Sequence, residues 1–174
     1  DKIVFTFSTP IAEVKMPAVF GDNMVLQQQS EVAIWGWAKA RASVTVTTSW
    51  NNKGYSVKAD NEGYWKVKVK TPAASFTPYK VTVSDGKKIT FNNVLIGEVW
   101  VCSGQSNMAQ QMKGYKGQPT AGSADLIVEA RPSTPIRSCN FKRTRTLEPQ
   151  DVCDATWYVH DPEGVSEASA AAYF

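Results

Sequence analysis

The alternation of apolar and polar residues changes near residue 93 and divides the chain into two parts. From residue 31 to about residue 93, apolar side chains recur at every second position, which is the period of half-buried β-strands. Val67 and Val69, for example, alternate with lysines. The predicted strands are residues 32–37, 44–50, 55–59, 65–70, 79–83 and 89–91, with turn sequences at 51–54, 60–63 and 85–86. Short antiparallel strands at this spacing predict a β-sandwich domain over residues 1–93.

Residues 94–174 have the pattern of the start of an α/β domain. Apolar residues at 94–96 and 99–102 predict a buried strand, and further elements are predicted after it. These are a helix over 124–130 with Ser123 as N-cap, a strand over 136–142, an irregular connection over 149–163, and a helix from residue 165 with Ser166 as N-cap. Two strands are too few for an α/β sheet. We therefore expect a large C-terminal part of this domain to be missing from the sequence.

The strongest candidate for chemistry is Ser106, which follows the apolar strand at a turn of small and polar residues. Gly104 permits a tight turn, and Gln105, Ser106 and Asn107 suit the first residues of a helix. Free backbone N–H groups at a helix N-terminus can stabilise the negative charge of a tetrahedral acyl intermediate. This layout is typical of hydrolases that use a serine nucleophile.

The same residues resemble a known family. Gly-Glu-Val-Trp at residues 97–100, followed by Cys-Ser-Gly-Gln-Ser-Asn-Met at 102–108, is similar to the first block of the sialate O-acetylesterases, a branch of the SGNH-type serine esterases. The likeness extends over residues 16–17, 20–27, 35–38, Trp157 and 169–174, and so spans nearly the whole chain. The resemblance implies that residues 94–174 begin an SGNH-hydrolase-like, flavodoxin-like α/β domain.

The resemblance also implies an activity. Ser106 would attack the acetyl carbonyl of O-acetylated sialic acid or a related acetylated sugar, and its own N–H would contribute to the oxyanion hole. Gly104, Gln105 and Asn107 would shape and support the turn. No metal and no organic cofactor is implied. Acetylated plant polysaccharide is a rival substrate, because sister esterases share the Gly-Gln-Ser-Asn-Met block.

A serine nucleophile needs a general base, normally a histidine held by an acidic partner. His160 is the single histidine, and it lies in a polar, turn-like stretch. The base of the resembling family belongs to an Asp-x-x-His motif, but Trp157 stands three residues before His160. We expect the chain alone to lack the His/Asp base, which the missing C-terminal part would supply, either in the same polypeptide or as a separate one.

Composition limits the partners and the location. The net charge of +3 is small, and the basic cluster at residues 142–145 has no neighbouring aromatic ladder, so it is interpreted as a solvated loop rather than a nucleic-acid site. No apolar stretch is long enough to span a bilayer. The chain opens at Asp1, as a processed or recombinant product would, and we expect an exported protein, periplasmic, secreted or lysosomal, whose signal peptide is absent here.

The remaining polar and sulfur-containing candidates have structural interpretations. Cys102 is predicted to be a buried strand thiol, while Cys139 and Cys153 are either bridged or free. Glu98 interrupts an apolar segment, which predicts an ion pair or a hydrogen bond that supports the serine turn.

The tryptophans leave a non-enzymatic alternative open. Trp50 and Trp65 are predicted to face the core, whereas Trp35 and Trp37 share one face of a strand. An exposed face would make Trp35 and Trp37 a stacking platform for sugars. The alternative function is then a non-catalytic carbohydrate-binding β-sandwich with a vestigial serine turn.

Overall fold

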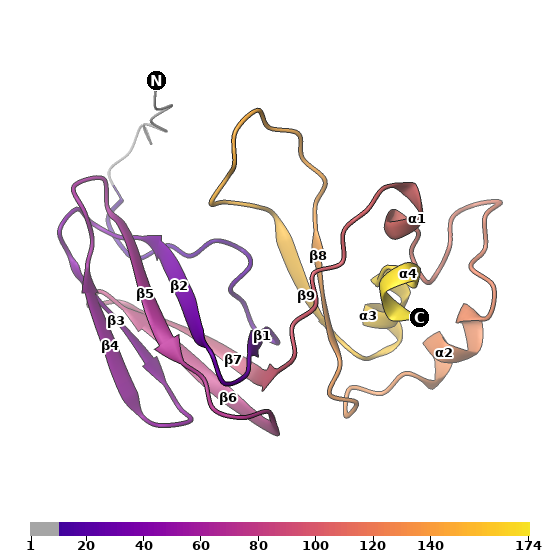
Figure 1. The fold of residues 1–174 in the computed structure, drawn as a ribbon, viewed down its shortest axis with the longest axis horizontal. Coiled ribbons are helices and arrows are strands. Elements are labelled where there is room, and N and C mark those ends of the chain that lie inside the picture. The colour runs from indigo at the N-terminus through magenta and orange to yellow at the C-terminus, as the bar shows by residue number, and fades with distance from the viewer. Residues whose placement is uncertain (1–10) are drawn as a thin grey trace.

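A computed structural model describes residues 11–174 of the chain and contains mostly β-structure with four short helices in that range (Figure 1). The first seven strands form one end of the molecule, and the hairpin and helices that follow form the other. Asp1, on which the expectation of a removed signal peptide rests, lies outside the described residues. None of the helices between residues 11 and 174 is long and apolar enough to cross a membrane.

The first part consists of a five-stranded mixed sheet and a two-stranded antiparallel sheet. Its strands are β1 (Val25–Gln27), β2 (Glu31–Trp37), β3 (Ser43–Thr48), β4 (Lys53–Lys58), β5 (Tyr64–Lys70), β6 (Ser75–Ser84) and β7 (Lys88–Gly97). The larger sheet has the order β1-β7-β6-β3-β4, in which β1 pairs with β7 in parallel and the other pairs are antiparallel. The smaller sheet pairs β2 with β5.

The apolar faces of the two sheets share one hydrophobic core. Ile34 and Trp65 come from the smaller sheet, while Val46, Val83 and Val94 come from the larger one, and none of the five is more than 1% exposed. The alternating pattern is therefore confirmed as the signal for half-buried strands, because every second side chain in β3 points into this core.

The second part is built from a hairpin and short helices. Its elements are α1 (Ser106–Ala109), α2 (Ser123–Glu129), β8 (Arg137–Phe141), β9 (Ala155–Val159), α3 (Pro162–Glu167) and α4 (Ala170–Tyr173). β8 and β9 pair in an antiparallel hairpin. Met112 and Val165 are buried in a second, smaller core with alanines of the helices. The strand over 136–142 and the helix over 124–130 are confirmed within one or two residues at each end, although the N-cap of α2 is Gly122 and Ser123 is its first residue.

Two predictions in this part are wrong in detail. The connection over 149–163 is not irregular throughout, since it contains β9 and the start of α3. The final helix is two short helices, and their N-caps are Asp161, which accepts from the N–H of Gly164, and Ser169, which accepts from the N–H of Ala172. Pro162 at the first position of α3 explains why that helix begins before residue 165, because proline has a helical φ and no N–H to satisfy.

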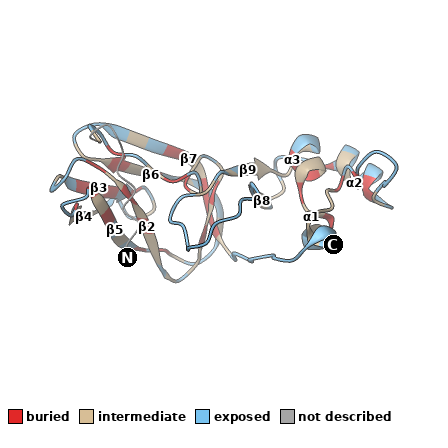
Figure 2. Ribbon diagram, turned by 90° about the horizontal axis from the view of Figure 1, so that it is seen from above, coloured by how far each residue is buried: buried red, intermediate tan, exposed pale blue. Residues whose placement is uncertain are grey.

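The apolar segment after β7 is not a buried strand. β7 ends at Gly97, and Val99, Trp100 and Val101 are 42%, 83% and 92% exposed. Figure 2 shows this segment as an exposed link between the two parts. An apolar run signals burial only where neighbouring elements cover it, and within residues 11–174 no strand pairs with this segment. The predicted strand at 99–102 is therefore wrong for this structure.

Two tryptophan hydrogen bonds join the two parts of the molecule. The indole N–H of Trp157 donates to the carbonyl of Val19 at 2.8 Å, and that of Trp35 donates to the carbonyl of Asp151 at 3.3 Å. The rings of Phe20 and Trp35 meet edge to face at 4.7 Å between centroids. Trp35 is half-buried by these contacts, so it does not form an open stacking face.

The other tryptophans of the sheets are also engaged. Trp37 is half-buried and packs edge to face on Tyr64, and Trp65 is 1% exposed. Trp50 is half-buried against the first core, and its N–H donates to the carbonyl of Lys70. The core positions predicted for Trp50 and Trp65 are thus confirmed, with Trp50 at the margin.

Candidate active site

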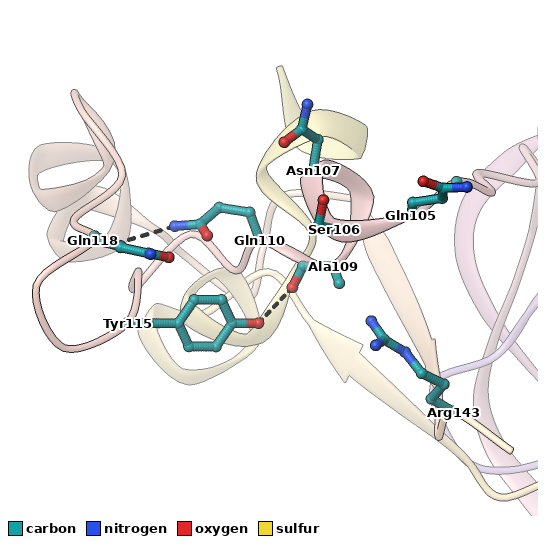
Figure 3. Close-up of a pocket in the computed structure, with 9 residues that line it drawn as sticks. Gln105, Ser106, Asn107, Ala109, Gln110, Tyr115, Gln118 and Arg143 are labelled. Atoms are coloured by element: carbon teal, nitrogen blue, oxygen red, sulfur yellow. Dashed lines mark hydrogen bonds between the residues drawn. The ribbon is translucent and has the colours of Figure 1, made fainter.

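Ser106 is the first residue of α1, and its side chain lies at an open hollow of about 780 Å³ (Figure 3). Gly104, Gln105 and Asn107 line the same hollow, so the structure brings together all four predicted site residues. The turn is closed by hydrogen bonds from the N–H of Ala109 to the carbonyl of Gln105 and from the N–H of Gln110 to the carbonyl of Asn107. Ser106 is exposed and begins a helical turn, so its hydroxyl is accessible from the hollow.

Gly104 has a steric role in the turn. A Cβ atom at this position would lie 3.0 Å from Cβ of Met108 and 3.7 Å from its Cγ. Met108 is itself held, because the hydroxyl of Ser169 donates to its sulfur at 3.2 Å. A side chain at residue 104 would therefore crowd Met108, and Met108 would have to shift to make room for it.

Glu98 anchors the start of the segment that leads to Ser106. Its two carboxylate oxygens accept hydrogen bonds from the side-chain amides of Gln27 at 3.0 Å and Gln28 at 2.6 Å. The side-chain oxygen of Gln27 accepts the N–H of Val99 at 2.9 Å. The predicted hydrogen bonding of Glu98 is confirmed, but its partners lie at the end of β1 and hold the chain where it leaves β7, rather than in the serine turn.

This anchor predicts a pH dependence. The hydrogen bonds from Gln27 and Gln28 lower the pKa of Glu98 below its ordinary value. A carboxyl with a lowered folded-state pKa stabilises the fold above its unfolded pKa, and this contribution disappears as the pH falls through the lowered value. We expect an NMR titration to show the Glu98 carboxyl and the Val99 amide shifting together below the ordinary glutamate range. A Glu98→Gln variant should lack the transition at Val99, and a Glu98 carboxyl that titrates at or above the ordinary value contradicts the anchor.

The far wall of the hollow contains residues that the sequence did not identify. Tyr115 and Gln118 form a tight turn through two mutual backbone hydrogen bonds, and the hydroxyl of Tyr115 donates to the carbonyl of Ala109 at 2.6 Å. The side-chain amide of Gln110 donates to the carbonyl of Gln118 at 3.2 Å. Gly117 within this turn has a φ of +77° and Gly114 just before it has a φ of +71°, so two glycines mark this stretch as a turn.

Arg143 lies on the side of the hollow near the end of β8. Its side chain is exposed, in agreement with the interpretation of residues 142–145 as a solvated loop. The sequence did not predict that Arg143 lies beside the hollow, because no local pattern shows that residue 143 approaches the Ser106 turn.

His160 is not part of the hollow. Its Nε2 atom is 2.8 Å from the hydroxyl of Tyr173, and the two rings stack at 5.8 Å between centroids. His160 and Tyr173 line a separate small cavity of about 20 Å³ between the hairpin and the last helices. Among the described residues, the single histidine therefore does not line the hollow at Ser106.

The three cysteines are free. Cys102 is exposed, so the prediction of a buried strand thiol is wrong, for the same reason that the strand itself is absent. Burial, with a smaller effect of the nearby Cys153, raises the pKa of Cys139 to about 12. Burial and the charge of Asp154 raise the pKa of Cys153 as well. The sequence left open whether Cys139 and Cys153 are bridged or free, and in the structure they are free.

These environments predict an order of alkylation. At pH 8 a thiol with a pKa of about 12 is ionised to only about one part in ten thousand, and the thiolate is the reactive form. We expect iodoacetamide to modify Cys102 first and Cys139 last, as measured by peptide mass spectrometry over time. A Cys102→Ser variant should lose the fast phase, and equal rates at Cys102 and Cys139 would contradict the burial of Cys139.

The described residues hold no cluster of three or more histidine, cysteine, aspartate or glutamate side chains that could bind a metal ion. The hollow instead offers hydroxyl, amide and guanidinium groups. Its chemistry is that of an exposed serine at the start of a helical turn, beside polar groups able to bind a polar ligand.

Comparison with known proteins agrees with the resemblance seen in the sequence. The chain is 37% identical over 105 residues to the sialate O-acetylesterase of Homo sapiens, which covers 54% of this chain and 20% of that protein. The sialate O-acetylesterase of Rattus norvegicus is 39% identical over 103 residues, covering 52% of this chain and 19% of that protein. The chain thus spans about a fifth of the curated relatives that it matches. No protein-family model matches the chain.

The fold has a counterpart among solved structures. A carbohydrate acetylesterase from Xanthomonas citri matches with a TM-score of 0.82 and 27% identity, over 92% of this chain and 35% of that chain. The chain is therefore related over part of its length to the sialate O-acetylesterases, and its fold resembles part of a carbohydrate acetylesterase.

Proposed function

We propose that the protein is a serine carbohydrate O-acetylesterase and that Ser106 is its nucleophile. The observation that carries the proposal is the position of Ser106, exposed at the first residue of α1 and facing an open polar hollow. The kinship with proteins named as sialate O-acetylesterases and as a carbohydrate acetylesterase supports it. In this proposal the β-sandwich domain that the sequence placed at residues 1–93 extends to the end of β7 at Gly97, because β7 belongs to the larger sheet, and the residues that follow, within the predicted range 94–174, begin an SGNH-type α/β domain of an exported enzyme.

The reaction would proceed through an acetyl-enzyme. The Ser106 oxygen attacks the acetyl carbonyl, the backbone N–H of Ser106 stabilises the oxyanion, and the sugar alcohol leaves. Water then hydrolyses the acetyl-enzyme and restores the serine. The proton of Ser106 needs an acceptor, and His160 faces Tyr173 rather than the hollow. We propose that the base lies outside residues 11–174.

O-acetylated sialic acid is the proposed substrate, on the strength of the names of the curated relatives. Acetylated xylan is the rival. The test is acetate release by the protein purified from its source at native length, with O-acetylated sialic acid and acetylated xylo-oligosaccharide compared at equal concentration. We expect faster acetate release from O-acetylated sialic acid. Faster release from the acetylated xylo-oligosaccharide would make acetylated xylan the substrate. No release from either compound contradicts the esterase proposal.

The isolated chain has a distinct expected behaviour. Without a general base at Ser106, the 174-residue chain should hydrolyse p-nitrophenyl acetate no faster than its Ser106→Ala variant. Initial rates at several pH values check this. Serine-dependent turnover by the isolated chain would show that a base within the chain reaches Ser106, contrary to the placement of His160.

A further inference from the structure

The hollow at Ser106 is lined by one positively charged residue and by no negatively charged residue among those described. Its lining consists of uncharged residues together with Arg143, and none of the described residues that line it carries a carboxylate. Figure 3 shows the guanidinium group of Arg143 reaching from its own segment toward the space in front of Ser106. A hollow with one cation and no anion favours a negatively charged ligand.

Arg143 is free to bind such a ligand. Its neighbour Lys142 faces Asp154, with 3.6 Å between the side-chain nitrogen and oxygen, whereas within residues 11–174 no hydrogen bond or ion pair engages the side chain of Arg143. The guanidinium group is permanently charged and presents N–H donors in a planar fork that matches a carboxylate. Two parallel N–H···O bonds to one carboxylate are the strongest contact that such a group makes.

Other polar groups of the wall are uncharged and already hydrogen-bonded within the protein, so they contribute less to the selection of a charged ligand. The side-chain amide of Gln110 already donates to Gln118 and to the hydroxyl of Thr120, and the hydroxyl of Tyr115 is committed to Ala109. These groups give the wall a fixed, neutral shape. Charge selection in the hollow therefore falls to Arg143.

We propose that Arg143 binds the carboxylate of an acidic O-acetylated sugar and so makes the site select sugar acids over neutral sugars. The inference rests on the proposed function, because it takes the hollow at Ser106 to be the place where the sugar binds. It assigns a specificity-determining residue and favours sialic acid over xylan, which the serine turn alone does not distinguish.

The test uses two ligands that differ at the carboxyl group alone: the methyl glycoside of N-acetylneuraminic acid, which carries a carboxylate, and its methyl ester, which is uncharged and carries one more methyl group. Both are titrated into the ¹⁵N-labelled chain, with the amide signals of Ser106 and Asn107 as the readout. We expect the acid to bind about fivefold to tenfold more tightly than the ester, as for a partly solvated charge-assisted contact.

Three variants separate Arg143 from the general positive charge of its loop. Arg143→Gln should abolish the preference for the acid, and Arg143→Lys should retain part of it, because lysine keeps the charge but not the fork. Arg145→Gln is the matched control, since Arg145 is exposed two residues away and does not line the hollow. It should retain the full preference.

The outcomes decide the proposal. Equal affinity for acid and ester, an unchanged preference in Arg143→Gln, loss of the preference in Arg145→Gln alone, or no binding of the acid would each overturn it. The esterase proposal can fail separately, because it depends on acetate release by the native-length protein. A preference that depends on Arg143, without acetate release, would leave a binding site for sugar acids and refute only the catalysis.

Discussion

Replacing Ser106 with alanine in the native-length protein should lower kcat/KM for acetate release by at least about a thousandfold. In the proposed mechanism the hydroxyl would form the covalent bond to the acetyl group, and the other hydroxyl of the hollow, that of Tyr115, is hydrogen-bonded to the carbonyl of Ala109. The KM for the sugar should change little, because the remaining lining groups are retained. Acetate release measured by a coupled assay over a range of sugar concentrations gives both constants.

Ser103→Ala is the matched control for this experiment. Ser103 is an exposed serine three residues earlier in the same segment, but it does not line the hollow. Its replacement should leave acetate release within about twofold of the native protein, as expected for a surface substitution without a partner. If Ser106→Ala kept more than a tenth of the activity, or if Ser103→Ala caused the larger loss, Ser106 would not be the nucleophile.

The parts of the fold that were predicted correctly depend on local sequence. The alternation in β3 and β5 reports which side chains face a core, and the turn before Ser106 is a property of its own residues. The N-cap of α3 could also have been recognised, because Asp161 followed by Pro162 is a common helix start. β9 was missed because it lies in a segment flanked by residues typical of loops.

The errors concern features that depend on distant partners. Val99 and Val101 are apolar enough for a buried strand, but burial requires other elements to cover them. The hollow is also lined by Arg143, Tyr115 and Gln118. The folded chain brings these residues close to Ser106, and no spacing in the sequence predicts it. The turn at Ser106 was therefore predictable as local structure, whereas the other residues that line the hollow became visible only in the structure.

Trp65→Ala should be among the most destabilising single substitutions in the chain. Trp65 is 1% exposed in the main core, and the opposite residue Gly36 approaches it so closely that a Cβ atom there would lie 3.1 Å from the indole ring. Removing the ring leaves a large cavity between the sheets, which costs about 3–5 kcal/mol of unfolding free energy. Urea unfolding followed by circular dichroism should show a lower midpoint with an unchanged slope.

Two companion variants make this prediction specific. The indole N–H of Trp65 is buried and has no hydrogen-bond partner among residues 11–174, so Trp65→Phe removes an unsatisfied donor together with part of the ring. It should cost only about 1–2 kcal/mol, because relief of the orphaned donor offsets part of the lost packing. Trp100→Ala removes a ring that is 83% exposed and should change stability by less than about 0.5 kcal/mol. If Trp100→Ala cost as much as Trp65→Ala, the segment between β7 and Ser106 would be packed in solution, and the site geometry described above would need revision.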